Sequence, residues 1–495
     1  MLRKPGNDFL KMKILILISL SISCSQPEKS ITTSSEMAKA AYDEGVTNYY
    51  YYNFEHAIKN FQKAVTLDPL FRMGYCRLSM AYYHFGDYQS ALEYNRLANK
   101  QLTRITRNED LFISWWNANL GNQFHTSRTY LTGLIEKNPF NKELQHLNAL
   151  NLKSQTMFPK AEQEWLNLLK QDENYLPAYV ELGELALQQE KFSQALDWFN
   201  KARLRCDECA VTYLNLGKAF FLSGDYANAE LELKTAIQLS PGLAISYLYL
   251  VDVYRAQGQY NQALKIIDKS IRSCYSDSVH FSDLLGTQAE LYILKNEFAR
   301  ADSLCALAFQ YDSKNEYAYY LSGLIKLKQS RFDAAFVEAN HIKLLAERNQ
   351  QESERIWTYH YLLLSRIFLK QNQLDNARET GRFAFKKNSL KDRLIAVINL
   401  CEIYYRQEQY NPAIELCESI LRKNPNYPLA HFWLAQLYEK MGELEMARNR
   451  YKQFLYLYRN ADEGLEDVRY SRERVAILEH NYPKVKSKQF ARDEN

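Results

Sequence analysis

Apolar residues along this chain follow the three- and four-residue steps of an α-helix, and they do so in paired segments. In the clearest pair, a first segment places Tyr213, Leu216 and Phe220 on one face. A second segment places Ala229 and Leu233 on one face in the same way. A short run of serine, glycine and aspartate separates the two segments, which is typical of a turn. The pattern therefore predicts a hairpin of two helices.

This hairpin pattern recurs along nearly the whole chain. One small residue of the second helix returns after 34 residues in most intervals and after 36 to 42 in the others. A period of this length is too long for a heptad repeat and indicates a stack of similar helical hairpins. The repeated positions are Ala57, Ala91, Ser127, Ala161, Ala195, Ala229, Ala263, Ala301, Ala335, Ala377, Ala413 and Ala447.

The residue types in the repeat have physical reasons. Small residues such as Gly217 and Ala229 let the two helices approach closely at the turn. Pro241 ends the second helix, because its ring cannot continue the hydrogen-bond ladder. With these residues the unit resembles the tetratricopeptide repeat. The resemblance implies an all-α fold, a right-handed superhelical solenoid of about twelve helix-turn-helix repeats with a C-terminal capping helix.

The same pattern sets the expected domain boundaries. We assign residues 37–460 to the solenoid. Residues 461–480 are charged and have a helical pattern, as expected of a helix that covers the last apolar face of a solenoid. Residues 481–495 are predicted to be a disordered tail.

The N-terminus carries a different signal. Lys11 and Lys13 precede a short apolar run that ends at Ile22, and Cys24 follows after the small residue Ser23. This order predicts a secretory signal peptide over residues 1–23. It resembles a bacterial lipoprotein signal, which implies that Cys24 is lipidated and that residues 24–36 form a lipidated tether. Ser21 departs from the leucine that this motif prefers, so an ordinary cleaved signal or an uncleaved anchor remains the alternative.

Charge and motifs narrow the functional classes. The chain has 62 basic and 58 acidic residues and a net charge of +4, which gives no reason to expect nucleic acid as a partner. The sequence contains no HExxH, no GxSxG and no glycine-rich phosphate loop. We therefore predict that the protein is not an enzyme and that it has no catalytic residues, no metal site and no cofactor.

Two pairs of cysteines leave alternatives open. Cys206 and Cys209 form a lone CxxC, which fits a local disulfide, free thiols or a metal or redox role. Cys401 and Cys417 are expected on the two helices of one hairpin, where a disulfide is allowed but not required.

The resemblance also implies a binding surface. In this family the first helix of each repeat lines the concave face of the superhelix. Inward positions here combine aromatic residues with isolated charges of both signs, which suits an extended or helical peptide. The predicted peptide groove consists of Tyr83, Lys218, Phe221, Asp252, Arg255, Tyr317, Tyr320, Tyr359, Arg366, Glu402 and Tyr405.

These inferences combine into one functional hypothesis. We expect a membrane-anchored protein-interaction scaffold of the bacterial cell envelope, whose partners are other envelope proteins and whose N-terminal lipid holds it at the membrane. We expect it to face the periplasm, with the outer membrane favoured and the leaflet left open. The alternative is an envelope lipoprotein that binds a small molecule or a glycan, because tyrosine-rich helical surfaces can stack sugars.

Overall fold

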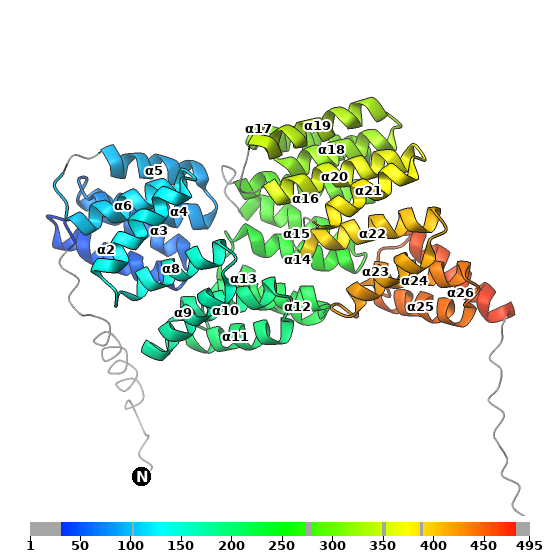
Figure 1. Ribbon diagram of the computed structural model, residues 1–495, viewed down its shortest axis with the longest axis horizontal. Helices are drawn as coiled ribbons and strands as arrows, with labels where there is room; N and C mark the ends of the chain where they lie inside the picture. Colours follow the sequence, from blue (N-terminus) through cyan, green and yellow to red (C-terminus); the bar gives the residue numbers. More distant parts are fainter. Residues whose placement is uncertain (1–30, 101–102, 274–278, 349–352, 387–389, 482–495) are drawn as a thin grey trace, which may run out of the picture.

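The computed structural model describes residues 31–100, 103–273, 279–348, 353–386 and 390–481. In these ranges the chain forms helices and no strands, and consecutive helices pack as pairs (Figure 1). The predicted fold class is thereby confirmed. The expected signal peptide, the lipidation site Cys24 and residues 482–495 of the predicted tail lie outside the described residues.

The first six hairpins cover the N-terminal half of the chain up to Leu239. They are α2 (Glu36–Tyr50) with α3 (Phe54–Leu67), α4 (Arg72–Phe85) with α5 (Tyr88–Lys100), α6 (Arg107–Leu120) with α7 (Phe124–Lys137), α8 (Lys142–Ser154) with α9 (Phe158–Gln171), α10 (Leu176–Gln188) with α11 (Phe192–Arg205), and α12 (Ala210–Ser223) with α13 (Tyr226–Leu239).

Six further hairpins and a last helix complete the stack. They are α14 (Ala244–Ala256) with α15 (Tyr260–Ser273), α16 (Val279–Leu294) with α17 (Phe298–Tyr311), α18 (Glu316–Lys328) with α19 (Phe332–Arg348), α20 (Ser353–Lys370) with α21 (Leu374–Lys386), α22 (Leu390–Arg406) with α23 (Tyr410–Leu421), and α24 (Pro428–Lys440) with α25 (Leu444–Leu457), followed by α26 (Glu466–Asn481).

Close contact between the two helices depends on small residues in the fifth and sixth hairpins. A Cβ atom added to Gly217 would lie 2.5 Å from Leu233 Cγ, and one added to Gly183 would lie 2.3 Å from the Phe199 ring. Ala229, whose carbonyl oxygen lies 3.3 Å from the same added Cβ of Gly217, is fully buried. The two helices therefore meet at a distance that a side chain at the glycine position would prevent.

The turn inside each hairpin has the same backbone conformation in all twelve cases. One residue per turn adopts a positive φ, which ends the first helix in the left-handed region. Glycine occupies this position in four turns, although the conformation is costly for any other residue. The twelve residues are Tyr52, Gly86, Asn122, Thr156, Glu190, Gly224, Gly258, Asn296, Ser330, Asn372, Glu408 and Gly442.

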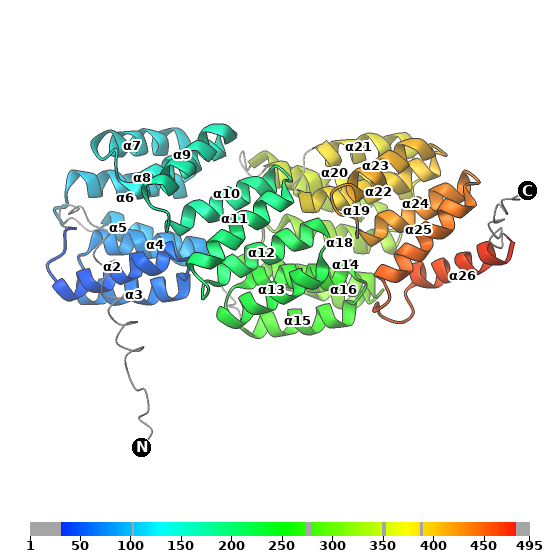
Figure 2. The same ribbon diagram turned by 90° about the horizontal axis from the view of Figure 1, so that it is seen from below.

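The superhelix closes on itself, so that residues far apart in sequence touch. Tyr52 packs in one apolar cluster with Leu176 and Tyr179 of α10. We call this contact the N-terminal seam. It brings the first hairpin against the fifth, and Figure 2 shows α10 and α11 directly beside the first hairpins.

A second closure, which we call the C-terminal seam, joins the turns after α12 and α14 to the loops around α24 and α25. Asn426 Nδ2 donates to the Gly224 carbonyl oxygen at 3.0 Å, across 202 residues of sequence. The Asp462 amide donates to the Gly258 carbonyl oxygen at 2.9 Å. The Asn261 amide donates back to Asp462 Oδ2 at 2.8 Å. Lys423 also pairs with a carboxylate of the fifth hairpin.

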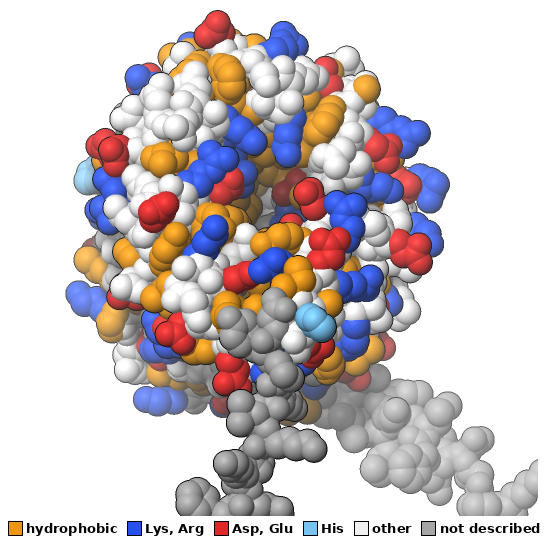
Figure 3. Space-filling model, turned by 90° about the vertical axis from the view of Figure 1, so that its right-hand side faces the viewer, with side chains coloured by type: hydrophobic (Ala, Val, Ile, Leu, Met, Phe, Trp, Pro, Cys, Tyr) orange, Lys and Arg blue, Asp and Glu red, His pale blue; other side chains and the backbone are white. Residues whose placement is uncertain are grey.

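The C-terminal helix α26 covers α25, as predicted for a capping helix. Val468, Ser471 and Leu478 are its buried side chains, and Arg474 forms an ion pair with Glu439 of α24. Figure 3 views the end of the molecule that carries this helix and shows a hollow among side chains near its centre. The stack therefore surrounds an inner space.

Candidate binding surface on the inner face

Charged residues on the first helices form a ladder along the inner face. Lys218 Nζ of α12 contacts both carboxylate oxygens of Glu184 in α10 at 2.8 Å. One period further along, Asp252 accepts a hydrogen bond from Arg255 at 2.8 Å. Arg255 also pairs with Glu290 of α16. Opposite charges one repeat apart thus neutralise each other across the stack.

Burial and the neighbouring carboxylates shift the pKa values of the ladder cations in opposite directions, and the carboxylates have the larger effect. Burial alone would lower the pKa of Lys218, but the Glu184 carboxylate outweighs it and raises the pKa. Burial likewise opposes the charge on Arg255, while Glu290 and Asp252 raise its pKa. The carboxylates of the ladder therefore favour the charged forms of Lys218 and Arg255.

Aromatic side chains continue the inner face after the charged ladder. The Tyr359 ring lies 5.5 Å from Tyr317 and 5.3 Å from Tyr320, measured between ring centroids. Tyr320 also raises the pKa of Arg366 in α20, and Glu402 of α22 adds to the effect. Three consecutive hairpins are thereby joined by tyrosine contacts and one arginine.

Of the eleven predicted groove residues, four are buried and seven are half-buried. Phe221, Asp252, Tyr320 and Tyr359 are buried, and their surfaces are used within the stack. The other seven are half-buried and keep part of their surface free: Tyr83, Lys218, Arg255, Tyr317, Arg366, Glu402 and Tyr405.

Two of the half-buried residues stand at the ends of this surface. Tyr83 packs edge-on against Trp116 with a centroid distance of 5.4 Å. Tyr405 lies 5.8 Å from Trp433, and Lys440 Nζ lies 5.9 Å from its ring centroid. The sequence placed these residues on first helices correctly, but it did not predict the partners Glu184 and Glu290. The signal was present, because Glu184 and Lys218 are opposite charges exactly one 34-residue period apart.

A buried ion pair lies between hairpins near the N-terminus. Arg77 of α4 contacts the two carboxylate oxygens of Glu143 in α8 at 2.5 and 2.8 Å. Burial raises the pKa of the Glu143 carboxyl, but the Arg77 guanidinium outweighs it, so that the pKa is lowered. Arg77 Nε also donates to the Tyr42 hydroxyl at 3.2 Å. The first, second and fourth hairpins are tied together at this point.

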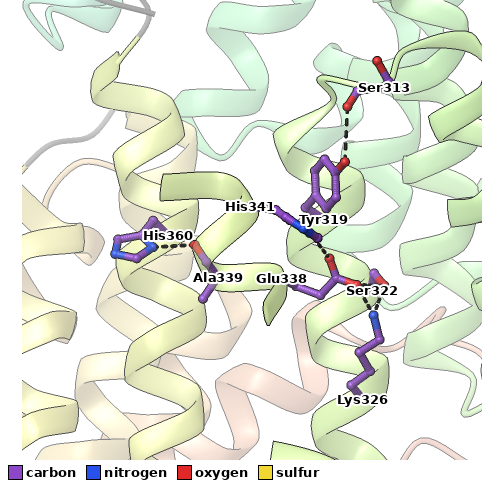
Figure 4. A network of polar contacts seen from close by, with 8 residues as sticks. All are labelled: Ser313, Tyr319, Ser322, Lys326, Glu338, Ala339, His341 and His360. Carbon is purple, nitrogen blue, oxygen red and sulfur yellow. Dashed lines mark hydrogen bonds and ion pairs between the residues drawn. The ribbon is translucent and has the colours of Figure 1, made fainter. Parts of the chain in front are cut away.

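A polar network that contains several titratable groups lies between α18 and α19 (Figure 4). At its centre is the buried Glu338 carboxylate. It accepts a hydrogen bond from Ser322 Oγ at 3.1 Å and forms an ion pair with Lys326. His341 Nδ1 lies 3.2 Å from the other carboxylate oxygen. Glu338 therefore joins α18 and α19, and His360 Nδ1 of α20 contacts the Ala339 carbonyl oxygen of α19 at 2.8 Å.

The cysteine alternatives are resolved as follows. Cys206 and Cys209 form a disulfide with a Cα–Cα distance of 5.4 Å. Cys401 and Cys417 are buried free thiols whose sulfur atoms lie 3.2 Å apart. Within the described ranges, no group of three or more histidine, cysteine or acidic side chains is arranged to hold a metal ion. No helix in the same ranges is long and apolar enough to span a membrane.

The fold and its continuous inner face define a helical-repeat protein made of stacked hairpins. Two family models, both described as tetratricopeptide repeat, match residues 220–273 and 396–463 in one case and 147–210 in the other. These parts of the chain are tetratricopeptide repeats, as the resemblance implied.

Similar proteins share the repeat. The chain is 24% identical over 464 residues to the TPR repeat-containing protein MJ1428 of Methanocaldococcus jannaschii, covering 85% of this chain and 76% of that protein. It is 27% identical over 199 residues to the BBSome complex member BBS4 homolog of Drosophila melanogaster, covering 32% and 40% of the two chains. Yeast Tom70 has 17% identity and a TM-score of 0.40, covering 90% of this chain and 97% of that one. This last likeness concerns the fold alone.

Proposed function

We propose that this protein is a protein-interaction scaffold of the bacterial cell envelope, anchored to the membrane by a lipid on Cys24. The observation that carries the scaffold part is the hairpin stack itself. Its first helices present one continuous inner face on which aromatic and charged side chains alternate. Such a face offers repeated anchor points to an extended or helical peptide segment.

The anchor part of the proposal is supported by the hydrogen bonds that hold Thr32 and Thr33 against the first hairpins. The amide and the hydroxyl of Thr32 each donate a hydrogen bond to the Glu109 carboxylate, both at 2.7 Å. Thr33 Oγ1 donates to Asp68 at 2.6 Å. The end of the predicted tether is thus fastened to α6 and to Asp68 at the C-terminal end of α3. Six residues separate Cys24 from Ile31 and span at most about 25 Å of extended chain. A lipid on Cys24 would therefore hold the first hairpins close to the membrane.

A photo-crosslinking experiment tests the scaffold proposal. A photoreactive phenylalanine derivative replaces Tyr405 on the inner face or, as a control, Leu231 on α13, which is 61% exposed. We expect discrete crosslinked proteins from position 405 in whole cells and none of the same products from position 231. Equal products from both positions, or glycan adducts instead of proteins, would reject peptide binding on the inner face.

A separate measurement tests the anchor. The full chain should incorporate labelled palmitate and fractionate with membranes, whereas Cys24→Ser should lose both properties. A membrane-bound Cys24→Ser protein without label would favour the uncleaved anchor instead.

A further inference from the structure

A pocket of about 530 Å³ lies on the second helices, away from the predicted groove residues. Helix α9 contributes two leucines, a glutamine and a lysine, helix α10 contributes a tyrosine, and helix α11 contributes a tryptophan and two cations. We call it the basic–aromatic pocket. Its lining residues are Gln163, Leu166, Leu169, Lys170, Tyr179, Trp198, Lys201 and Arg205.

Aromatic rings hold two of the cations in place. Lys201 Nζ lies 4.1 Å from the centroid of the Trp198 ring. The Arg205 guanidinium carbon lies 4.9 Å from the Tyr179 centroid, and Arg205 Nε donates to a backbone carbonyl of α10's preceding loop at 3.4 Å. The Tyr179 and Trp198 rings lie 6.1 Å apart and form one wall. The cations are thereby positioned without a carboxylate.

The charge of the pocket is uncompensated. None of the described residues that line it is acidic. Over the described part of the chain, Lys170, Lys201 and Arg205 have no carboxylate within ion-pair distance. This differs from the inner face, where Lys218 and Arg255 are both paired. Three cations without a carboxylate partner in the described residues therefore lie beside the half-buried side chains of Leu166, Leu169 and Trp198.

We propose that the basic–aromatic pocket binds an acidic segment of a partner protein. An apolar side chain of the segment packs between Leu166, Leu169 and Trp198, and flanking carboxylates face Lys170, Lys201 and Arg205. The argument rests on charge complementarity and on the mixed lining. A nucleic acid fits less well, because the cations surround a single pocket instead of following a stripe, and the whole chain is nearly neutral. The proposal rests on the scaffold function but concerns a different surface.

A peptide-binding assay tests this pocket. The probe is a short fluorescein-labelled peptide of alternating glutamate and leucine, and its control carries lysine in place of glutamate. Full-length protein in detergent is titrated by fluorescence anisotropy at low and at physiological salt. We expect binding of the acidic peptide that weakens with salt, and K201E/R205E should weaken it by roughly tenfold or more.

A matched variant separates the pocket from general charge effects. K265E/K269E also replaces two exposed cations four residues apart, on the second helix α15, and changes the net charge equally. We expect it to bind within about twofold of the wild type. Equal loss in both variants, equal binding of the lysine peptide, or tighter salt-sensitive binding of polyuridine than of the acidic peptide would overturn the proposal. Crosslinks from position 405 should persist in K201E/R205E, which distinguishes failure here from failure of the scaffold proposal.

Discussion

Closure of the superhelix at the C-terminal seam can be tested with one pair of glycine variants. Gly224 has a φ of +85° and lies in the seam, and a Cβ atom there would come within 2.2 Å of Asn424 Oδ1. Gly442 has a φ of +82°, but a Cβ atom there meets nothing within 4 Å. Both occupy the same turn position of their hairpins. G224A and G442A therefore share the backbone penalty and differ in the seam contact.

The expected difference follows from the contacts. Alanine in the left-handed region costs each variant about 1–2 kcal/mol. In G224A, Asn424 must also move, which breaks its hydrogen bond to the Tyr226 hydroxyl at 3.4 Å and disturbs the 3.0 Å bond from Asn426 to the Gly224 carbonyl oxygen. Two such bonds are worth about 0.5–1.5 kcal/mol each. The seam should therefore lose about 1–3 kcal/mol in G224A alone.

Hydrogen exchange is the suitable assay, because stability in a repeat array is distributed among neighbouring units. We expect the amides of residues 422–427 to exchange roughly 5- to 150-fold faster in G224A than in G442A. Small-angle scattering should show a larger radius of gyration for G224A only. If both variants exchange and scatter alike, the seam contributes no stability and the reasoning is wrong.

Three other changes give separable outcomes. Thr156→Gly should raise the melting temperature, with a gain of about 0.5–1 kcal/mol, because Thr156 holds a φ of 59° that glycine adopts freely. Replacing Cys206 and Cys209 by serine should cost about 2 kcal/mol, the loop-closure entropy for so short a loop, and dithiothreitol should lower the melting temperature of the wild type but not of the variant. Glu143→Gln should cost about 3–5 kcal/mol at neutral pH, because it leaves the buried Arg77 charge unpaired. Since Glu143 has a lowered pKa in the folded state, its contribution is present above its unfolded pKa and lost as the pH falls through the folded value, so the difference between wild type and Glu143→Gln should shrink in acid unfolding curves.

The hairpins and their order could be predicted from the sequence because they depend on local features. The position of Gly217 opposite Ala229 and the proline after the second helix determine one unit, and the period repeats it. The run of serine, glycine and aspartate at residues 223–225 indicated a turn, but the sequence did not show that twelve turns share a residue of positive φ. Thr156 adopts the same conformation because the surrounding hairpin requires it, and no local preference of threonine indicates this.

The two seams, the ion pairs of the inner face and the basic–aromatic pocket were not predicted from the repeat period. Small differences in packing angle accumulate along a solenoid, so the contact between Asn426 and Gly224 could not be predicted from the repeat period. Side chains of the inner face were assigned to the right helices, but their mutual pairing follows from the distance between neighbouring hairpins. The basic–aromatic pocket escaped prediction because only first helices were considered as binding elements, whereas Trp198 and Lys201 come from a second helix.

The two surfaces differ in what binding would cost. A peptide that uses Lys218 or Arg255 on the inner face must compete with Glu184 or Glu290, because these charges are already paired and partly desolvated. Its net gain comes chiefly from aromatic contacts, so inner-face binding should depend weakly on salt. The cations of the basic–aromatic pocket have no such competitor, and an acidic segment gains their full attraction while leaving every internal ion pair intact. The dependence of binding on salt therefore tells which of the two surfaces a given partner occupies.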